Sequence, residues 1–180
     1  MLESAGLPIE IAPADIDERA VERRMQGDAG EVAMLLAYEK AKVIAAQKPG
    51  RHVVGADQTL VLGERRFTKP VDRITARAQL SDLRGQTHEL HSAVVVAHDG
   101  AILFVKTEVA RLTMRTFSDT FLDAYLDQMG DAVMTSVGGY QVEGRGIQLF
   151  EKIEGDHFTI LGLPLPPLLA FLRRAKLLAE

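Results

Sequence analysis

The clearest hydrophobic pattern in the chain has helical spacing and lies between residues 31 and 47. Its apolar side chains fall roughly on one stripe, formed by Val32, Leu35, Leu36, Tyr38 and Val43. Such spacing predicts a helix with one buried face. The segment Lys48-Pro49-Gly50 follows at once, and proline and glycine end helices. We therefore expect a long helix over 31–47 that stops at a tight turn.

Weaker helical signals occupy 18–24, 74–85, 121–129 and a C-terminal stretch that begins after Gly162-Leu163-Pro164. Gly85 is placed to end the second of these helices. Ser118 is a suitable N-cap for the third, because its hydroxyl can accept a hydrogen bond from a backbone N–H group of the first turn. The glycine-rich piece 136–150 predicts a loop that runs into a short helix.

Alternating or fully apolar runs predict strands at 8–11, 52–56, 59–62, 66–67, 87–97 and 101–113. The turn His98-Asp99-Gly100 joins the last two runs into a long hairpin. Helices and strands alternate without strict βαβ regularity, which argues against a simple doubly wound sheet. The pattern therefore predicts an α/β fold with a mixed sheet. A length of 180 residues fits one domain over 1–180, or one domain with two lobes.

Composition narrows the classes of function. Hydrophobic residues make up 47% of the chain, which is enough for a sizeable core without metals or disulfides. The absence of cysteine excludes a thiol nucleophile and a cysteine-ligated metal site. A formal charge of −4 argues against binding polymeric nucleic acid, although a single nucleotide needs only a few local charges. We find no apolar run of membrane-spanning length and no signal peptide, so we expect a soluble, cytoplasmic protein.

Polar residues that interrupt the buried run 53–56 are the first candidates for chemistry. Asp57 and Gln58 follow four apolar or small residues, where a rigid strand can hold a carboxylate at a cleft. An aspartate that simply begins a turn is the alternative. Lys69 precedes Pro70, which stiffens the backbone beside an ammonium that could neutralise phosphate. A solvated surface lysine is the alternative there.

Three other charged residues have structural and functional interpretations. Glu18 lies at the start of a short helix, where an acid also stabilises the positive helix end. Lys40 lies in the middle of the long helix and could simply face solvent. Glu143 lies in the glycine-rich loop, which could bring its backbone close to a ligand. We interpret His88 and His91 as structural, because strand positions three apart point to opposite faces and cannot share a metal.

Taken jointly, these segments resemble one family. The order AGLPIEIAPADIDE, LAYEKAKVIA, VVGADQTLVLGERRFTKP, LRGQTHELHSAV, GGYQVEGRGIQLFEKIEGD and ILGLPL is similar to the Maf-like nucleoside triphosphate pyrophosphatases over nearly the whole chain. The resemblance implies an elongated, twisted mixed sheet with a central cleft between two lobes. It also implies hydrolysis of a nucleotide to the monophosphate and pyrophosphate with Mg²⁺ or Mn²⁺. A homodimer is a further expectation from the family.

The resemblance also implies a role for each candidate. Asp57 matches the family's catalytic acid, as proton acceptor for the attacking water or as a metal ligand that positions it. Lys69 matches a lysine that holds phosphate oxygens. Glu18 would lie near the metal and Lys40 near phosphate. Attack at the α-phosphorus spreads negative charge over its oxygens, and lysines and a metal stabilise that charge.

Two residues bear on the choice of nucleotide. Many family members have threonine where this chain has Gln58, and glutamine where it has Glu143, and the combination seen here resembles the subgroup that acts on 7-methyl-GTP. A carboxylate favours the positive charge of an N7-methylated purine, whereas an amide suits the edge of uracil or thymine. A dTTP or UTP pyrophosphatase of the same family is the alternative. A non-catalytic nucleotide-binding protein that regulates cell division is another.

The chain departs from the family at its start. The family normally opens with a short strand and a SxSPRR-like loop that binds phosphate, and Met1 aligns just after that motif. We expect that the start codon has been assigned too late. A chain that really lacked the loop would turn over slowly, because losing an arginine at the transition state can cost on the order of 10³-fold in rate.

Overall fold

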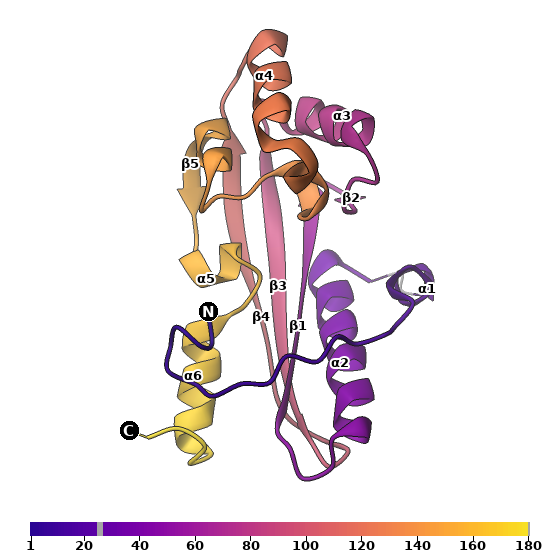
Figure 1. Cartoon of the computed structure of the whole chain (residues 1–180), viewed down its shortest axis with the longest axis vertical. Helices are drawn as coiled ribbons and strands as arrows, with labels where there is room; N and C mark the ends of the chain where they lie inside the picture. Colours follow the sequence, from indigo (N-terminus) through magenta and orange to yellow (C-terminus); the bar gives the residue numbers. More distant parts are fainter. Residues whose placement is uncertain (25–26, 180) are drawn as a thin grey trace. The chain divides into compact units, whose positions relative to one another are not determined.

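The computed structural model describes residues 1–24 and 27–179, with the side chains of 23 and 24 left undescribed (Figure 1). Its helices are α1 (Glu18–Arg24), α2 (Ala29–Gln47), α3 (Arg73–Leu83), α4 (Asp119–Met129), α5 (His157–Ile160) and α6 (Leu165–Arg174). Its strands are β1 (Val53–Leu62), β2 (Arg65–Phe67), β3 (Thr87–His98), β4 (Ala101–Met114) and β5 (Phe150–Glu154). Three 3₁₀ turns lie between α4 and β5, namely η1 (Gly130–Met134), η2 (Val137–Gly139) and η3 (Arg145–Leu149).

Within the described residues the strands form one five-stranded sheet in the order β2-β1-β3-β4-β5. This confirms the predicted α/β class. In this sheet β1 pairs antiparallel with β2, and β4 pairs antiparallel with β5. The predicted hairpin joins β3 to β4 through Asp99 and Gly100. Both have positive φ, +46° and +81°, as a tight two-residue hairpin turn requires.

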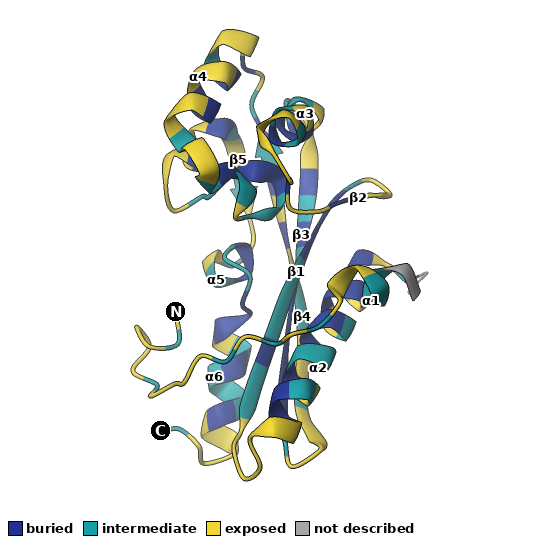
Figure 2. Cartoon of the chain, turned by 45° about the vertical axis from the view of Figure 1, so that its right-hand side comes forward, coloured by how far each residue is buried: buried dark blue, intermediate teal, exposed yellow. Residues whose placement is uncertain are grey.

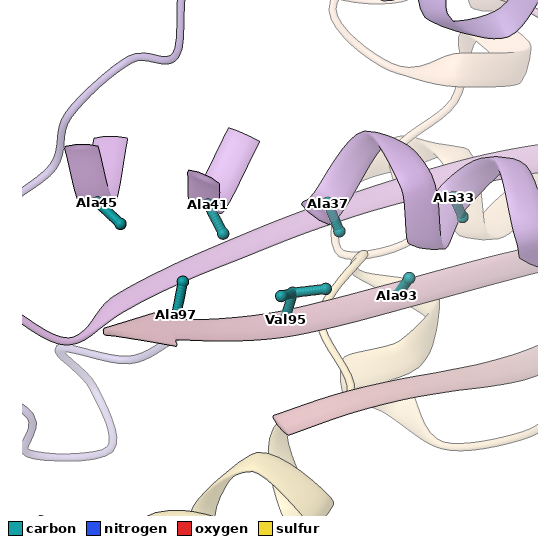
Figure 3. Packing of buried hydrophobic residues seen from close by; sticks show 7 residues of the cluster. All are labelled: Ala33, Ala37, Ala41, Ala45, Ala93, Val95 and Ala97. Atoms are coloured by element: carbon teal, nitrogen blue, oxygen red, sulfur yellow. The ribbon is translucent and has the colours of Figure 1, made fainter. Parts of the chain in front are cut away.

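The chain divides into two compact units. The first unit comprises Met1–Gln58, His91–Val109 and Asp156–Glu180, and the second comprises Thr59–Leu90 and Ala110–Gly155. In the first unit, α2 packs on β3 through a stripe of small side chains, which are Ala33, Ala37, Ala41 and Ala45 against Ala93, Val95 and Ala97 (Figure 3). The opposite face of β3 carries Val94 and Val96, which pack against α6. Alternation along β3 therefore buries both of its faces.

A close approach of backbones fixes α2 on the sheet. An added Cβ at Gly55 of β1 would lie 2.3 Å from the carbonyl oxygen of Ala37, so only glycine fits there. The start of α2 is fixed by a capping box. Asp28 accepts a hydrogen bond from the backbone N–H of Glu31, and the Glu31 side chain accepts one from the backbone N–H of Asp28. The close approach at Gly55 and the cap at Asp28 thus fix where α2 lies on the sheet, and hence which of its side chains face β1. Figure 2 shows the buried face of this helix.

The second unit contains α3, α4 and the loop that connects α4 to β5. Its core includes Leu80, Leu83, Leu112, Leu122 and Leu126, all buried. Both helices begin with side-chain caps, Asp72 for α3 and Ser118 for α4, and the second of these was predicted from the sequence. Throughout the described part of the chain, no helix combines the length and apolar character that crossing a membrane demands.

Two local predictions were wrong. β1 runs without interruption from Val53 to Leu62, so Asp57 and Gln58 lie inside a strand and not at its end. Their polar groups do not end the strand because partners on neighbouring elements satisfy them, as described below. Residues 8–11 form no strand, and the apolar side chain of Ile11 is 80% exposed. The glycine-rich piece ends in the short 3₁₀ helix η3, as predicted, and the strand β5 that follows it was not indicated by the sequence pattern.

Candidate active site

A cluster of three charged side chains lies in the first unit. The ammonium group of Lys40 lies 2.6 Å from Oε1 of Glu18 and forms a short contact with Oδ1 of Asp57. The side chain of Asp57 is 11% exposed, that of Lys40 22% and that of Glu18 48%. Solvent exposure therefore increases across the cluster, from the nearly buried Asp57 to the half-exposed Glu18. The structure brings together three of the residues that the sequence singled out.

Each member of the cluster comes from a different element. Asp57 lies on β1, Lys40 on α2, and Glu18 is the first residue of α1. The alternation of side chains along β1 directs Asp57 to the face on which α2 packs. Lys40 stands next in the chain to Ala41 of the small-residue stripe, at the place where α2 comes closest to β1. The close contact at Gly55 brings the lysine within reach of a carboxylate two residues farther along the strand.

The environment of Lys40 favours its charged form. Partial burial is the largest single effect and lowers the pKa of this ammonium. The hydrogen bonds and negative charges of Asp57 and Glu18 together outweigh burial, so the pKa is raised above the ordinary 10.5. Lys40 is therefore a permanent cation at neutral pH, held by two carboxylates and poised where a phosphate oxygen could replace one of them.

Gln58 points to the opposite face of β1. Its side-chain nitrogen lies 2.8 Å from Oγ of Ser92, 3.0 Å from the carbonyl oxygen of Thr159 and 3.1 Å from that of Ile160. Ser92 and Thr159 are fully buried, and the Ser92 hydroxyl donates to the same Thr159 carbonyl at 2.7 Å. The amide of Gln58 is thus engaged by β3 and α5. No local sequence pattern indicates this contact, because Thr159 is about a hundred residues away along the chain.

Lys69 and Glu143 belong to the second unit, and both are exposed. Lys69 lies between β2 and the buried Pro70. The carbonyl oxygen of Thr68, just before it, accepts a 2.9 Å hydrogen bond from Nε2 of Gln79. Glu143 lies in a turn that a 3.2 Å backbone hydrogen bond from Gly144 closes. Both side chains are therefore exposed, and hydrogen bonds hold the backbone next to each of them.

A buried polar pair holds the glycine-rich loop of the second unit. Nε2 of His88 lies 2.7 Å from the hydroxyl of Tyr140, and burial lowers the pKa of His88 to about 4. The hydroxyl of Tyr125 donates to the carbonyl oxygen of Gly139 at 3.2 Å. These contacts agree with the structural role predicted for His88. They fix the loop just before Glu143.

A cavity of about 370 Å³ lies beside the charged cluster in the first unit. Residues 8–14 form one wall, the start of β1 forms another, and Lys40 of α2 and Lys48, which caps the end of α2, also line it. Glu10 pairs with Lys48 at 2.7 Å and with Arg51 at 3.8 Å. One carboxylate therefore faces two cations at this end of the cavity, whereas one cation faces two carboxylates at Lys40. The sequence analysis did not single out Glu10, Lys48 or Arg51 as site residues.

The carboxylates of the cluster suit one kind of metal. No group of three or more histidine, aspartate or glutamate side chains with metal-binding geometry occurs in residues 1–24 and 27–179. Glu18 and Asp57 nevertheless converge on one cation, the Lys40 ammonium, and offer hard oxygen donors. Mg²⁺ commonly takes only one or two carboxylates from a protein and completes its shell with water and substrate phosphate. The donor set therefore fits a divalent cation that arrives with a phosphate ligand.

Comparison with known proteins adds an independent result. Residues 1–175 match the family described as Maf-like protein. A nucleoside triphosphate pyrophosphatase of Bradyrhizobium diazoefficiens is 59% identical over 180 residues, which cover 99% of this chain and 89% of the relative. One from Rhodopseudomonas palustris is 54% identical with the same coverage. A 7-methyl-GTP pyrophosphatase of Brucella abortus is 50% identical over 179 residues, covering 98% of this chain and 90% of that protein.

Proposed function

Because the chain belongs to the Maf-like protein family, we propose that it is a nucleoside triphosphate pyrophosphatase. Relatives with 50% to 59% identity over nearly all of the chain carry that activity in their names, which supports the reaction class. In this reaction water attacks the α-phosphorus, the bond from that phosphorus to the bridging oxygen breaks, and pyrophosphate leaves. The proton of the water must be accepted by the protein. The products are the nucleoside monophosphate and pyrophosphate.

The observation that carries the proposal is the convergence of Asp57, Lys40 and Glu18. Asp57 is the proton acceptor for the attacking water, since it is the least exposed carboxylate of the three-residue cluster and the strand holds it rigidly. Lys40 exchanges one of its carboxylate partners for a phosphate oxygen, where its ammonium stabilises the charge that develops in the transition state. Lys69 holds phosphate oxygens, and its exposure leaves the ammonium available for this role.

Glu18 and Asp57 would hold a divalent cation, Mg²⁺ or Mn²⁺. When bound, such a cation supplies positive charge against the phosphate oxygens and a site for water. The side chains of the protein accept the proton and bind the phosphate oxygens. Glu18 is half exposed and can turn from the ammonium toward a cation in solvent, whereas Asp57 is fixed.

The substrate we propose is 7-methyl-GTP or a similarly modified nucleotide. The named relative from Brucella abortus supports this choice. Glu143 supplies the chemical reason, because its carboxylate attracts the positive charge of an N7-methylated purine and can accept from guanine N1–H and N2–H₂. A pyrimidine triphosphate offers no such cation. Glu143 would therefore bind the base, whereas the charged cluster acts on the phosphates.

The test is pyrophosphate release from 7-methyl-GTP, UTP, dTTP and GTP with Mg²⁺ or Mn²⁺, by wild type and by Asp57→Asn. We expect the wild type to prefer 7-methyl-GTP and the variant to lose most of the activity on every nucleotide. Glu143→Gln is the matched specificity variant, and it should lower the preference for 7-methyl-GTP over UTP. Preference for UTP or dTTP in the wild type would keep the reaction and refute the substrate. Hydrolysis of no nucleotide would refute the function.

A further inference from the structure

Glu143 lies at the tip of a loop whose two ends touch. An added Cβ at Gly146 would lie 2.4 Å from the carbonyl oxygen of Gln141 and 2.8 Å from its backbone nitrogen, so the two backbones are in direct contact. The turn between them is closed by the 3.2 Å hydrogen bond from Gly144 to Gln141. Gly146 is buried, whereas Glu143 and Gly144 are exposed. Residues 141–146 therefore form a tight loop that carries the carboxylate at its tip.

Side chains attach this loop to the rest of the second unit. Tyr140, the residue just before the loop, is buried, and its hydroxyl lies 2.7 Å from Nε2 of the buried His88 on β3. The Ser136 hydroxyl donates to the carbonyl oxygen of Tyr140 at 2.6 Å. The backbone hydrogen bonds within 136–147 join residues three apart, so they shape local turns and do not attach the loop to the sheet. The position of the loop therefore depends on these side chains.

The contact between His88 and Tyr140 is almost completely buried, with residue exposures of 1% and 5%. In the part of the chain that the structure describes, Nδ1 of His88 has no hydrogen-bond partner, so the Tyr140 hydroxyl is the only partner of the ring. Phe150 packs edge-on against the Tyr140 ring, with 4.9 Å between the centroids. The loop also donates from Arg145 to Gln128 of α4 at 2.7 Å, but this hydrogen bond is exposed and competes with water.

We infer that Tyr140 and His88 are positioning residues for substrate choice, because their buried contact holds the 141–146 loop so that Glu143 meets the base in one fixed place. This inference rests on the proposed function, in which Glu143 binds the base. A carboxylate on a rigid loop contributes to binding without an added entropic cost of ordering the loop. On a loose loop the same carboxylate could also adapt to other bases, so the discrimination between nucleotides would fall.

The first variant is Tyr140→Phe, which keeps the ring and removes only the hydroxyl. The buried imidazole of His88 then loses its partner, and a buried polar group without a partner is unfavourable, so the support of the loop loosens. The ratio of kcat/KM between 7-methyl-GTP and UTP should fall by about 10-fold, because a misplacement of about 1 Å can cost up to about 100-fold. The KM for 7-methyl-GTP should rise more than kcat falls, because the change affects binding of the base.

The double variant with Glu143→Gln separates positioning from general stability. If Tyr140 acts through Glu143, then Tyr140→Phe should hardly change the ratio once the carboxylate is gone. Ser118→Ala is the matched control, because it removes the N-cap of α4 in the same unit and destabilises the protein without touching the loop. This control should keep the wild-type ratio. A wild-type ratio in Tyr140→Phe, or effects of Tyr140→Phe and Glu143→Gln that multiply in the double variant, would overturn the inference.

A second measurement does not depend on activity. Hydrogen exchange of the backbone amides in 141–146 should accelerate in Tyr140→Phe and in His88→Phe, which removes the other partner, and should stay unchanged in Ser118→Ala. Unchanged exchange of 141–146 in Tyr140→Phe would overturn the inference even if the wild type proved inactive. An inactive wild type with accelerated exchange in both variants would refute the proposed function, and with it the role in substrate choice, but would support the buried contact as the holder of the loop.

Discussion

Replacing Lys40 by methionine gives the sharpest test of the charged cluster. The change keeps most of the aliphatic side chain but removes the ammonium, so the nearly buried Asp57 loses its ionic partner. Removing one partner of a buried ion pair typically costs about 3–5 kcal/mol, because the other charge is left uncompensated. Lys40 is 22% exposed and Glu18 48%, so water relieves part of that cost. We expect a loss of about 2–3 kcal/mol in the free energy of unfolding.

The assay is thermal or urea unfolding followed by circular dichroism, with Lys48→Met as the matched control. Lys48 caps the C-terminal end of the same helix and pairs with Glu10, but both partners are about half exposed, at 43% and 52%. An exposed pair contributes little, so this variant should move the midpoint far less. The Lys40 variant should lower Tm by about 5–10 °C for a chain of this size. Equal shifts for the two variants would refute the reasoning.

Two further results follow from the same argument. Asp57→Asn added to Lys40→Met removes the stranded charge, so the double variant should be more stable than the sum of the two single losses predicts. The pH dependence has a definite sign. The folded pKa of Lys40 is raised above 10.5, so its contribution is fully present below that pH and is lost as the pH rises through the folded value. Stability curves of wild type and Lys40→Met should therefore converge only at strongly alkaline pH.

Three other predictions concern the supports of the site. Because the folded pKa of His88 is lowered from 6.5 to about 4, wild-type stability should fall as the pH falls through that window, by on the order of 2–3 kcal/mol, and His88→Gln should flatten the slope in urea titrations. Gln79→Leu should lower kcat/KM on all nucleotides, because the backbone beside Lys69 loses its hydrogen bond. The urea midpoint of unfolding should change little, because the loss of this hydrogen bond is offset by removing the buried Oε1 of Gln79, which has no hydrogen-bond partner among the described residues. Normal activity of this variant would contradict a role of Gln79 in holding the backbone beside Lys69. Gly55→Ala should destabilise the fold by more than about 3 kcal/mol, as measured by urea unfolding, because the new methyl group would lie 2.3 Å from a carbonyl oxygen. Gly50→Ala, with φ +72° but open space around it, should cost only about 1 kcal/mol.

Much of the fold could be predicted from the sequence because its signals are local. The stripe of apolar residues predicted α2, the cap at Ser118 predicted α4, and the turn at Asp99 and Gly100 predicted the hairpin. Each depends on residues that are neighbours in the chain. Strand β5 is different, because its pattern in FEKIE is mostly polar and it is defined by pairing with β4.

The site shows the same division. Asp57, Lys40 and Glu18 were chosen from the sequence, and the structure brings them together. Their neighbours could not be predicted, because the contacts depend on tertiary packing. The substrate contact of Gln58 stays a prediction, and the contacts of its amide with Ser92 and the end of α5 were not indicated by any local pattern. The break predicted at Asp57 failed for the same reason, since a polar residue inside a strand is tolerated only when another element supplies its partner.

The placement of Asp57 and Gln58 on consecutive positions of β1 limits how this chain can change its length. Side chains of a strand alternate with a period of two. Inserting or deleting one residue between Gly55 and Asp57 would turn the carboxylate toward α5 and the amide toward Lys40. Two residues would restore the faces but move both groups along the strand by roughly 6–7 Å. Substitutions can therefore vary the chemistry of this part of β1, whereas insertions and deletions are confined to its flanking turns.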